Sequence, residues 1–255
     1  MLENTDFKQY RESLGFKSQQ NFKAFLSAKD IKPQVDFSYI DALNARLCEI
    51  FNRLNGIYYK PRNIEVFLQD SLFSVYEIMR KQGILEKLTN QGRRKEEVYF
   101  SWMRGYLICA FFKEALATIF DVPLDEIQNI GADDFSNLEV FKRTPKADLQ
   151  IGTTRLEIQS GFQGVNDIKA HKVWEAKRVF EKEGQETLAM HIDLFNGQVA
   201  LVNLSKIEDN HVNWIIRAQM EGQMVFNIDP NDFKWGCCSP HPLNYLPCSL
   251  NPQPN

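Results

Sequence analysis

The chain has 255 residues, of which 44% are hydrophobic and 25% are charged, and its formal net charge is −3. This composition is typical of a folded globular protein and excludes the disordered and low-complexity classes. The charge argues against a uniformly basic coat for nucleic acid, although basic residues can still cluster locally. The length fits one large domain or two small ones.

The N-terminal segment is polar and lacks the apolar run of a signal peptide. The longest apolar stretch, Tyr106–Phe112, is too short to cross a membrane, so we expect no membrane span. The chain has five cysteines, an odd and unevenly spaced set. We therefore expect reduced thiols and a cytoplasmic location.

Residues 1–95 are predicted to form a helical N-terminal region. Apolar residues spaced three and four apart predict helices over Asn21–Ser27, Phe37–Leu54 and Ile64–Gln82. A scaffold is the simpler role for this region, and DNA contacts, dimerisation or a helix-turn-helix-like reader of DNA are the alternatives. In the second helix the expected buried stripe comprises Ile40, Leu43, Leu47, Ile50 and Leu54.

Residues 96–236 are predicted to form a mixed α/β core. A long apolar helix is expected over Glu97–Phe120, and a second helix over Asn166–Glu183 ends at Gly184. The Asn196-Gly197 pair predicts a hairpin between the last two strands. Residues 237–255 are rich in proline and are expected to be irregular. The predicted strands are Leu138–Lys142, Ala147–Ile151, Arg155–Ser160, Thr187–Phe195 and Gln198–Leu204.

Three polar residues of two neighbouring predicted strands are the candidate site. Alternation places Asp148 on one face of its strand and Glu157 with Gln159 on one face of the next. If the strands pair, these side chains converge, and two carboxylates with an amide oxygen suit Mg²⁺. The alternative is an amphipathic hairpin whose polar face is merely solvated.

This arrangement resembles the PD-(D/E)XK nuclease superfamily, particularly type II restriction endonucleases. That family has an Asp opening one strand, then Glu or Asp, any residue and Lys on the next strand, with helices before and after. Asp148 and Glu157 match the two acids, and Glu114 on the preceding helix matches an accessory acid. Gln159 stands where the family has Lys, as it does in a minority of restriction enzymes.

The resemblance implies a restriction-endonuclease-like mixed central sheet flanked by helices, with Mg²⁺ held by Asp148 and Glu157. Gln159 has no titratable nitrogen and would orient the attacking water rather than act as a general base. A lysine of the following helix is an alternative source of positive charge. Lys169 is the nearest one in sequence, and we expect it to contact phosphate.

Two groups of basic residues are candidates for contacts to DNA phosphates. A solvated helix face and a mobile basic loop are the respective alternatives. The first group, on the helix after the motif, is Lys169, Lys172, Lys177, Arg178 and Lys182, and the second, in the preceding loop, is Arg93, Arg94 and Lys95.

Other signals are weaker. The group Cys237, Cys238, His241 and Cys248 has zinc-binding residue types but lacks the usual CxxC spacing. His191 lies within a predicted strand and is expected to be structural rather than catalytic. No glycine-rich phosphate loop occurs, so we expect no nucleotide cofactor.

Together these features predict a Mg²⁺-dependent type II restriction endonuclease that binds double-stranded DNA as a homodimer, because a symmetric site matches a two-fold protein. A repair or recombination nuclease of the same fold is one alternative. A catalytically silent DNA-binding protein is the other, and Gln159 is the residue that raises it.

Overall fold

The computed structural model describes residues 3–28, 31, 33–89, 92–131, 146–161, 165–218 and 222–240. The chain divides into two compact units between Asp36 and Phe37. The predicted strand at Leu138–Lys142 and the tail residues His241 and Cys248 lie outside the described residues. Within those ranges, no helix combines the length and the apolar character needed to cross a bilayer.

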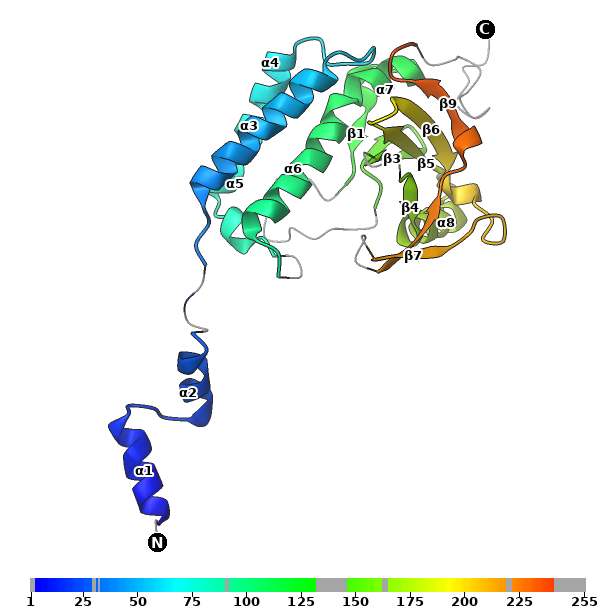
Figure 1. Cartoon of the computed structure of the whole chain (residues 1–255). Helices are drawn as coiled ribbons and strands as arrows, with labels where there is room; N and C mark the ends of the chain where they lie inside the picture. Colours follow the sequence, from blue (N-terminus) through cyan, green and yellow to red (C-terminus); the bar gives the residue numbers. More distant parts are fainter. Residues whose placement is uncertain are drawn as a thin grey trace. The chain divides into compact units, whose positions relative to one another are not determined.

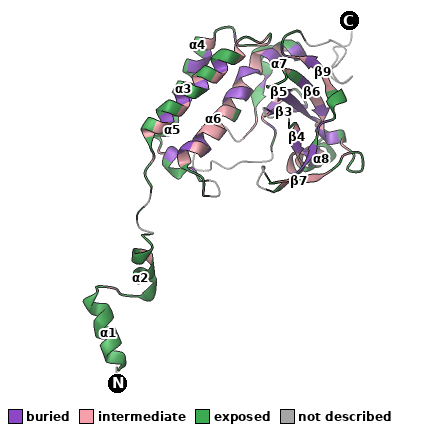
Figure 2. Ribbon diagram, in the orientation of Figure 1, coloured by how far each residue is buried: buried purple, intermediate pink, exposed green. Residues whose placement is uncertain are grey.

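The first unit contains two helices, α1 (Asn4–Ser13) and α2 (Gln19–Leu26) (Figure 1). Helix α2 begins at Gln19, slightly before the predicted start, because the Ser18 hydroxyl accepts the backbone N–H of Asn21 at 3.2 Å. A serine in this position satisfies a backbone donor that the first helical turn leaves unpaired. No residue of either helix is buried (Figure 2).

The helices that precede the sheet in the second unit lie close to the predicted ranges. Helix α3 spans the predicted range and packs beside α6 (Figure 1). Its buried stripe differs from the predicted one and includes Asn44, whose side chain accepts the Tyr99 hydroxyl at 2.5 Å. The helices are α3 (Phe37–Leu54), α4 (Ile64–Phe67), which continues through a π-helical turn (Leu68–Phe73) into α5 (Ser74–Lys81), α6 (Lys95–Phe111), α7 (Lys113–Phe120) and α8 (Ala170–Glu183).

The prediction of one helix over Glu97–Phe120 is wrong, because Phe112 separates α6 from α7. The rings of Phe111 and Phe112 are both buried and lie 5.3 Å apart. Consecutive residues of a straight helix point about 100° apart, since there are about 3.6 residues per turn. Consecutive pairs inside α6, Val98 with Tyr99 and Leu107 with Ile108, are buried as well, so this part of the chain packs into the core on more than one side.

Two sheets form the rest of the second unit. In the larger sheet β3 and β5 are parallel and the other neighbours are antiparallel. Its order is β1 (Gln128–Asn129), β2 (Leu149–Ile151), β3 (Thr154–Gly161), β5 (Thr187–Asp193), β6 (Gln198–Asn203) and β9 (Phe233–Gly236). The smaller sheet has the order β4 (Asp167–Lys169), β8 (Gln223–Asn227) and β7 (Ile215–Arg217).

The predicted fold class, a mixed sheet flanked by helices with a helical N-terminal region, is confirmed. The β5–β6 hairpin through Asn196-Gly197 is also confirmed, with His191 opposite Ala200. Helix α8 ends at Gly184, whose φ of +68° suits glycine. It begins at Ala170 rather than at the predicted Asn166, because Asp167–Lys169 pairs with β8.

Helix α8 covers one face of the larger sheet. Its residues Val173 and Ala176 share a buried cluster with Ala189 of β5 and Val202 of β6. Side chains alternate along a strand, so Leu188 and its same-face neighbours point to the opposite face. Strand β3 also contacts α6, and its first four residues are buried. The centre of the sheet is therefore enclosed, and the candidate site lies there.

Candidate active site

The β2–β3 hairpin brings the two predicted acids together. Leu149 pairs with Leu156 in antiparallel register, so Asp148 lies opposite Glu157. The Asp148 Oδ2 atom accepts the backbone N–H of Ile158 at 2.8 Å. The carboxylate of Asp148 is thus held against the peptide bond that joins Glu157 to Ile158.

Glu157 points toward α8 and away from solvent. In the parallel β3–β5 register Glu157 pairs with Ala189, which belongs to the cluster under α8. Residues paired across neighbouring strands have side chains on the same face of the sheet. Glu157 is only 5% exposed, whereas a plain amphipathic hairpin would leave its polar face in water. A buried carboxylate needs a compensating charge or hydrogen bonds.

Lys172, in the first turn of α8, supplies that charge. Its Nζ lies 2.7 Å from Glu157 Oε2, and the two side chains are 14% and 7% exposed. The same ammonium donates to the backbone carbonyl of Lys146 at 3.1 Å. Lys172 therefore joins α8 to β3 at Glu157 and to the segment before β2, two residues ahead of Asp148.

Gln159 lies on the same face as Glu157. Its Nε2 is 3.4 Å from Glu157 Oε1, so the amide and the ammonium approach different oxygens of one carboxylate. Burial raises the pKa of Glu157, and the opposing influences are, in order of size, Lys172, Gln159 and Lys169. Lys169, directly before α8, therefore lies within electrostatic reach of the site.

Positive charge gathers where β4 passes into α8. Burial, together with the charges of Lys169 and Lys172, lowers the pKa of His171 below its ordinary value. The first backbone N–H groups of a helix and its dipole also favour an anion at this end. This corner can hold an anionic group beside the two carboxylates.

The structure does not bring Glu114 into this group. Glu114 is in the first turn of α7, and its carboxylate lies 3.6 Å from the Arg62 guanidinium. In the part of the chain that the structure describes, no three or more His, Cys, Asp or Glu side chains form a group that could hold a metal ion. Asp148 and Glu157 are therefore a pair, without Glu114 as a third acid.

The loop candidates for DNA contact make intramolecular contacts. The Arg94 guanidinium lies over the Tyr39 ring, 4.8 Å from its centroid. The contact between Arg94 and Tyr39 holds the start of α6 against α3. The partners are Ser101 for Arg93 at 3.0 Å, Glu96 for Arg94 at 3.4 Å, and the Glu86 carbonyl for Lys95.

Further along α8 two of the basic residues are in ion pairs. Lys177 lies 2.8 Å from Asp209, and Arg178 makes two bonds of 2.8 Å to Glu175. Exposed pairs of this kind contribute little stability but reduce the free positive charge. Of the basic residues in this group, Lys172 and Lys169 at the beginning of the helix are the two whose charges act on Glu157.

Two buried polar groups lie near the site: Asp167, which sequence reasoning missed, and His191, which it expected to be a structural residue of its strand. The Asp167 side chain is 1% exposed and accepts from Arg217 at 2.7 Å and from Asn227 at 3.1 Å. His191, the register partner of Gln159, is 2% exposed, and its Nε2 lies 2.9 Å from Asn166 Oδ1. The partners of Asp167 come from β7 and β8, far along the chain, so no local pattern could have revealed its contacts.

The arrangement defines a carboxylate pair, with Glu157 buried and Asp148 half-buried, and an ammonium between the hairpin and a helix N-terminus. Compared with family models, with curated proteins and with solved structures, the chain matches none of them significantly.

Proposed function

We propose that the chain is a Mg²⁺-dependent type II restriction endonuclease, which hydrolyses phosphodiester bonds of double-stranded DNA at a specific sequence. The observation that carries the proposal is the Lys172 ammonium, 2.7 Å from the Glu157 carboxylate. The family that the motif resembles has a lysine at the position of Gln159. Here α8 brings a lysine to the same carboxylate from another element.

The donor set suits a hard divalent cation. Asp148 and Glu157 would hold Mg²⁺, because carboxylate oxygens are the ligands it prefers and each of the two side chains offers two such oxygens. The Lys172 ammonium already lies between the Glu157 carboxylate and the backbone carbonyl of Lys146. The oxygen atoms at this place therefore already surround one positive charge. When bound, the metal would supply Lewis-acid polarisation of a phosphate oxygen and a more acidic water.

The chain's own residues have distinct roles in this proposal. Lys172 keeps a positive charge beside the carboxylates and stabilises negative charge that develops on a phosphate. Gln159, which cannot titrate, donates or accepts a hydrogen bond and orients the attacking water. Lys169 and the N-terminus of α8 hold the phosphate. The Ile158 N–H fixes the Asp148 carboxylate in one orientation.

Two alternatives make different use of the same residues. The Lys172–Glu157 pair can serve as a purely structural ion pair, which favours a catalytically silent DNA-binding protein. A repair or recombination nuclease would use the same chemistry on structured DNA or DNA ends. The proposal also includes a homodimer, since two active sites cut both strands of a symmetric sequence, and a location in the cytoplasm.

Incubation of the purified chain with phage DNA distinguishes these functions. We expect discrete fragments with Mg²⁺, none with EDTA, and a common sequence at the mapped fragment ends. Cutting at ends or junctions only would indicate the repair nuclease, and binding without cutting would indicate the silent protein. Asp148→Asn should be inactive, and the matched control Asp125→Asn, at an exposed acid outside the site, should be fully active.

A further inference from the structure

The first unit consists of two short helices that carry their own start signals. At α1 the Glu3 side chain accepts a backbone N–H of the first turn, and Asp6 in turn accepts the Glu3 N–H at 2.8 Å. At α2 Ser18 is the cap. Helices of 10 and 8 residues are marginal in water unless an apolar face packs against something. Their sequence favours a helical form that needs a partner.

Each helix presents an apolar stripe to solvent. Phe7, Tyr10 and Leu14 follow one face of α1 and its C-terminal end, at spacings of three and four. Phe22, Phe25 and Leu26 do the same on α2. The exposed fractions are 47% for Phe7, 64% for Tyr10, 43% for Leu14, 38% for Phe22, 63% for Phe25 and 67% for Leu26.

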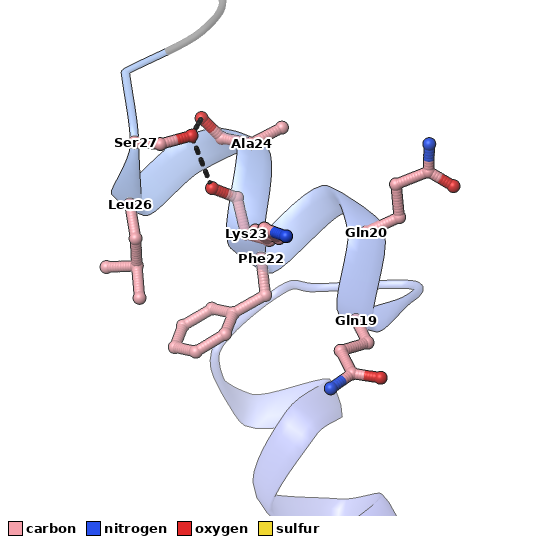
Figure 3. Close-up of a pocket in the computed structure, with 7 residues that line it drawn as sticks. All are labelled: Gln19, Gln20, Phe22, Lys23, Ala24, Leu26 and Ser27. Atoms are coloured by element: carbon pink, nitrogen blue, oxygen red, sulfur yellow. Dashed lines mark hydrogen bonds between the residues drawn. The ribbon is translucent and has the colours of Figure 1, made fainter.

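Phe16, in the connection between the two helices, packs against the apolar stripe of α2. Its ring centroid lies 4.8 Å from that of Phe22 and 5.4 Å from that of Phe25. Figure 3 shows Phe22 and Leu26 on one side of α2 and Gln20 on the other. A hollow of about 850 Å³ lies against α2, and the described residues that line it belong to α2 and Ser27, both apolar and polar ones. A hollow lined by one helix lacks an opposite wall, which a second apolar surface would supply.

The size of the two stripes suits a dimer contact. At roughly 200 Å² for each large side chain, the exposed parts of the six residues amount to about 600 Å². A standard protein interface buries about 800 Å² on each partner, and flanking helix surface would supply the difference. The stripes are therefore large enough to support one specific contact.

The charge of the same segment permits contact with a copy of itself. Residues 3–28 contain four basic and three acidic residues, so two copies would repel each other little. An apolar stripe flanked by nearly balanced charge is complementary to the same stripe on another chain. The residues are Lys8, Arg11, Lys17 and Lys23 against Glu3, Asp6 and Glu12.

We propose that residues 3–28, which we name the N-terminal arm, pair with the N-terminal arm of a second copy of this chain. The stripes of α1 and α2 pack against the same stripes of the partner, and the four helices form a two-fold bundle. A two-fold contact uses one self-complementary surface on both subunits. This proposal does not depend on nuclease activity and identifies the surface through which the chain dimerises.

Sedimentation equilibrium of the full chain tests it. We expect a dimer for the wild type and a dissociation constant raised about 100-fold or more in the double variant Phe25→Gln, Leu26→Gln, because large exposed anchors dominate interfaces. Ile216→Gln, at a 73% exposed apolar residue of β7, is the control and should remain dimeric.

Each other outcome contradicts the proposal. A wild type that is monomeric at 100 µM would show that the N-terminal arm packs on its own chain or on a different protein. A double variant that remains as dimeric as the wild type would place the contact elsewhere. Loss of the dimer in Ile216→Gln would point to β7. No residue of α1 or α2 is buried, so the substitutions at Phe25 and Leu26 should leave the second unit folded.

Discussion

Lys172 and Glu157, from a helix and a strand that are separate in sequence, form a nearly buried ion pair with 2.7 Å between Nζ and Oε2. Gln159 approaches the other carboxylate oxygen, at 3.4 Å. One carboxylate is thus held by a positive charge from α8 and by an amide from its own strand. This relationship determines what the site can do and how the fold responds when it is disturbed.

Replacing Lys172 by Met should destabilise the chain by about 3 kcal/mol near pH 7.5, because a buried carboxylate would lose its counter-ion. Lys182→Met, at an exposed position of the same helix, is the matched control and should change stability by less than about 0.5 kcal/mol. Urea unfolding of both variants measures the difference. Equal stability of Lys172→Met and wild type would show that the pair contributes nothing to the folded state.

The cost of Lys172→Met should depend on pH. Burial raises the pKa of Glu157 and Lys172 lowers it, so loss of the ammonium leaves the pKa higher still. A carboxyl with a raised pKa in the folded state loses stability as the pH rises from the unfolded pKa through the folded one. The variant should therefore be closer to wild type at pH 5 than at pH 7.5 in urea unfolding. A penalty that is equal or larger at pH 5 would contradict this assignment.

His191 should make the wild type sensitive to acid. Burial lowers the pKa of His191 to about 4, against an opposing influence of Asp193 and Asp167. Below the ordinary pKa the unfolded chain binds a proton that the folded chain does not, so stability falls as the pH decreases. Between pH 7.5 and pH 5 the wild type should lose about 2 kcal/mol more than His191→Leu.

His211 offers the control for this experiment, because it is exposed and lies 3.4 Å from Glu208 at the surface. His211→Leu should retain the acid sensitivity of the wild type within about 0.5 kcal/mol. Chemical unfolding across the pH range gives both slopes. If His191→Leu keeps the full wild-type slope, His191 is not the residue responsible.

A methyl group at Gly161, the last residue of β3, should crowd its neighbours. A Cβ atom there would lie 2.6 Å from Asn166 Oδ1, 3.0 Å from His191 Nε2 and 3.1 Å from the Val165 carbonyl oxygen. Gly161→Ala should therefore cost about 1–3 kcal/mol through overpacking. Thermal and urea unfolding measure the change.

Gly105, within α6, is the counterpart with open space around its Cα. Gly105→Ala should stabilise the chain by about 0.5–1 kcal/mol, because alanine favours a helix. If Gly161→Ala and Gly105→Ala change the free energy of unfolding by the same amount and in the same direction, a methyl group at Gly161 does not clash with its neighbours.

Much of the local structure could be predicted from sequence because local patterns determine it. The limits of α3, the Asn196-Gly197 hairpin and the end of α8 at Gly184 follow from apolar spacing and turn chemistry. The start of α8 could not be predicted in the same way, because Asp167–Lys169 becomes a strand only by pairing with β8. Such pairing joins residues far apart in the chain.

The candidate site was predictable to a similar extent. Strand alternation and the register of the hairpin place Asp148 opposite Glu157, with Gln159 on the same face as Glu157. The contact of Lys172 with Glu157 depends on how α8 packs on the sheet, and sequence spacing does not determine this. Lys169 is nearer in sequence, yet Lys172 makes the hydrogen bond.

Nicking of supercoiled plasmid DNA by the wild type and by Asp148→Asn, compared in the same Mg²⁺ buffer, tests the proposed active site most directly. Asparagine keeps an oxygen that can accept the Ile158 N–H but removes the negative charge, so the fold should persist, as circular dichroism can verify. We expect nicking by the wild type only, none in EDTA, and a loss of at least about 1,000-fold in the variant, equivalent to about 4 kcal/mol of transition-state stabilisation. Equal Mg²⁺-dependent nicking by both proteins, or none by the folded wild type on any DNA, would contradict a metal-dependent nuclease site at Asp148 and Glu157.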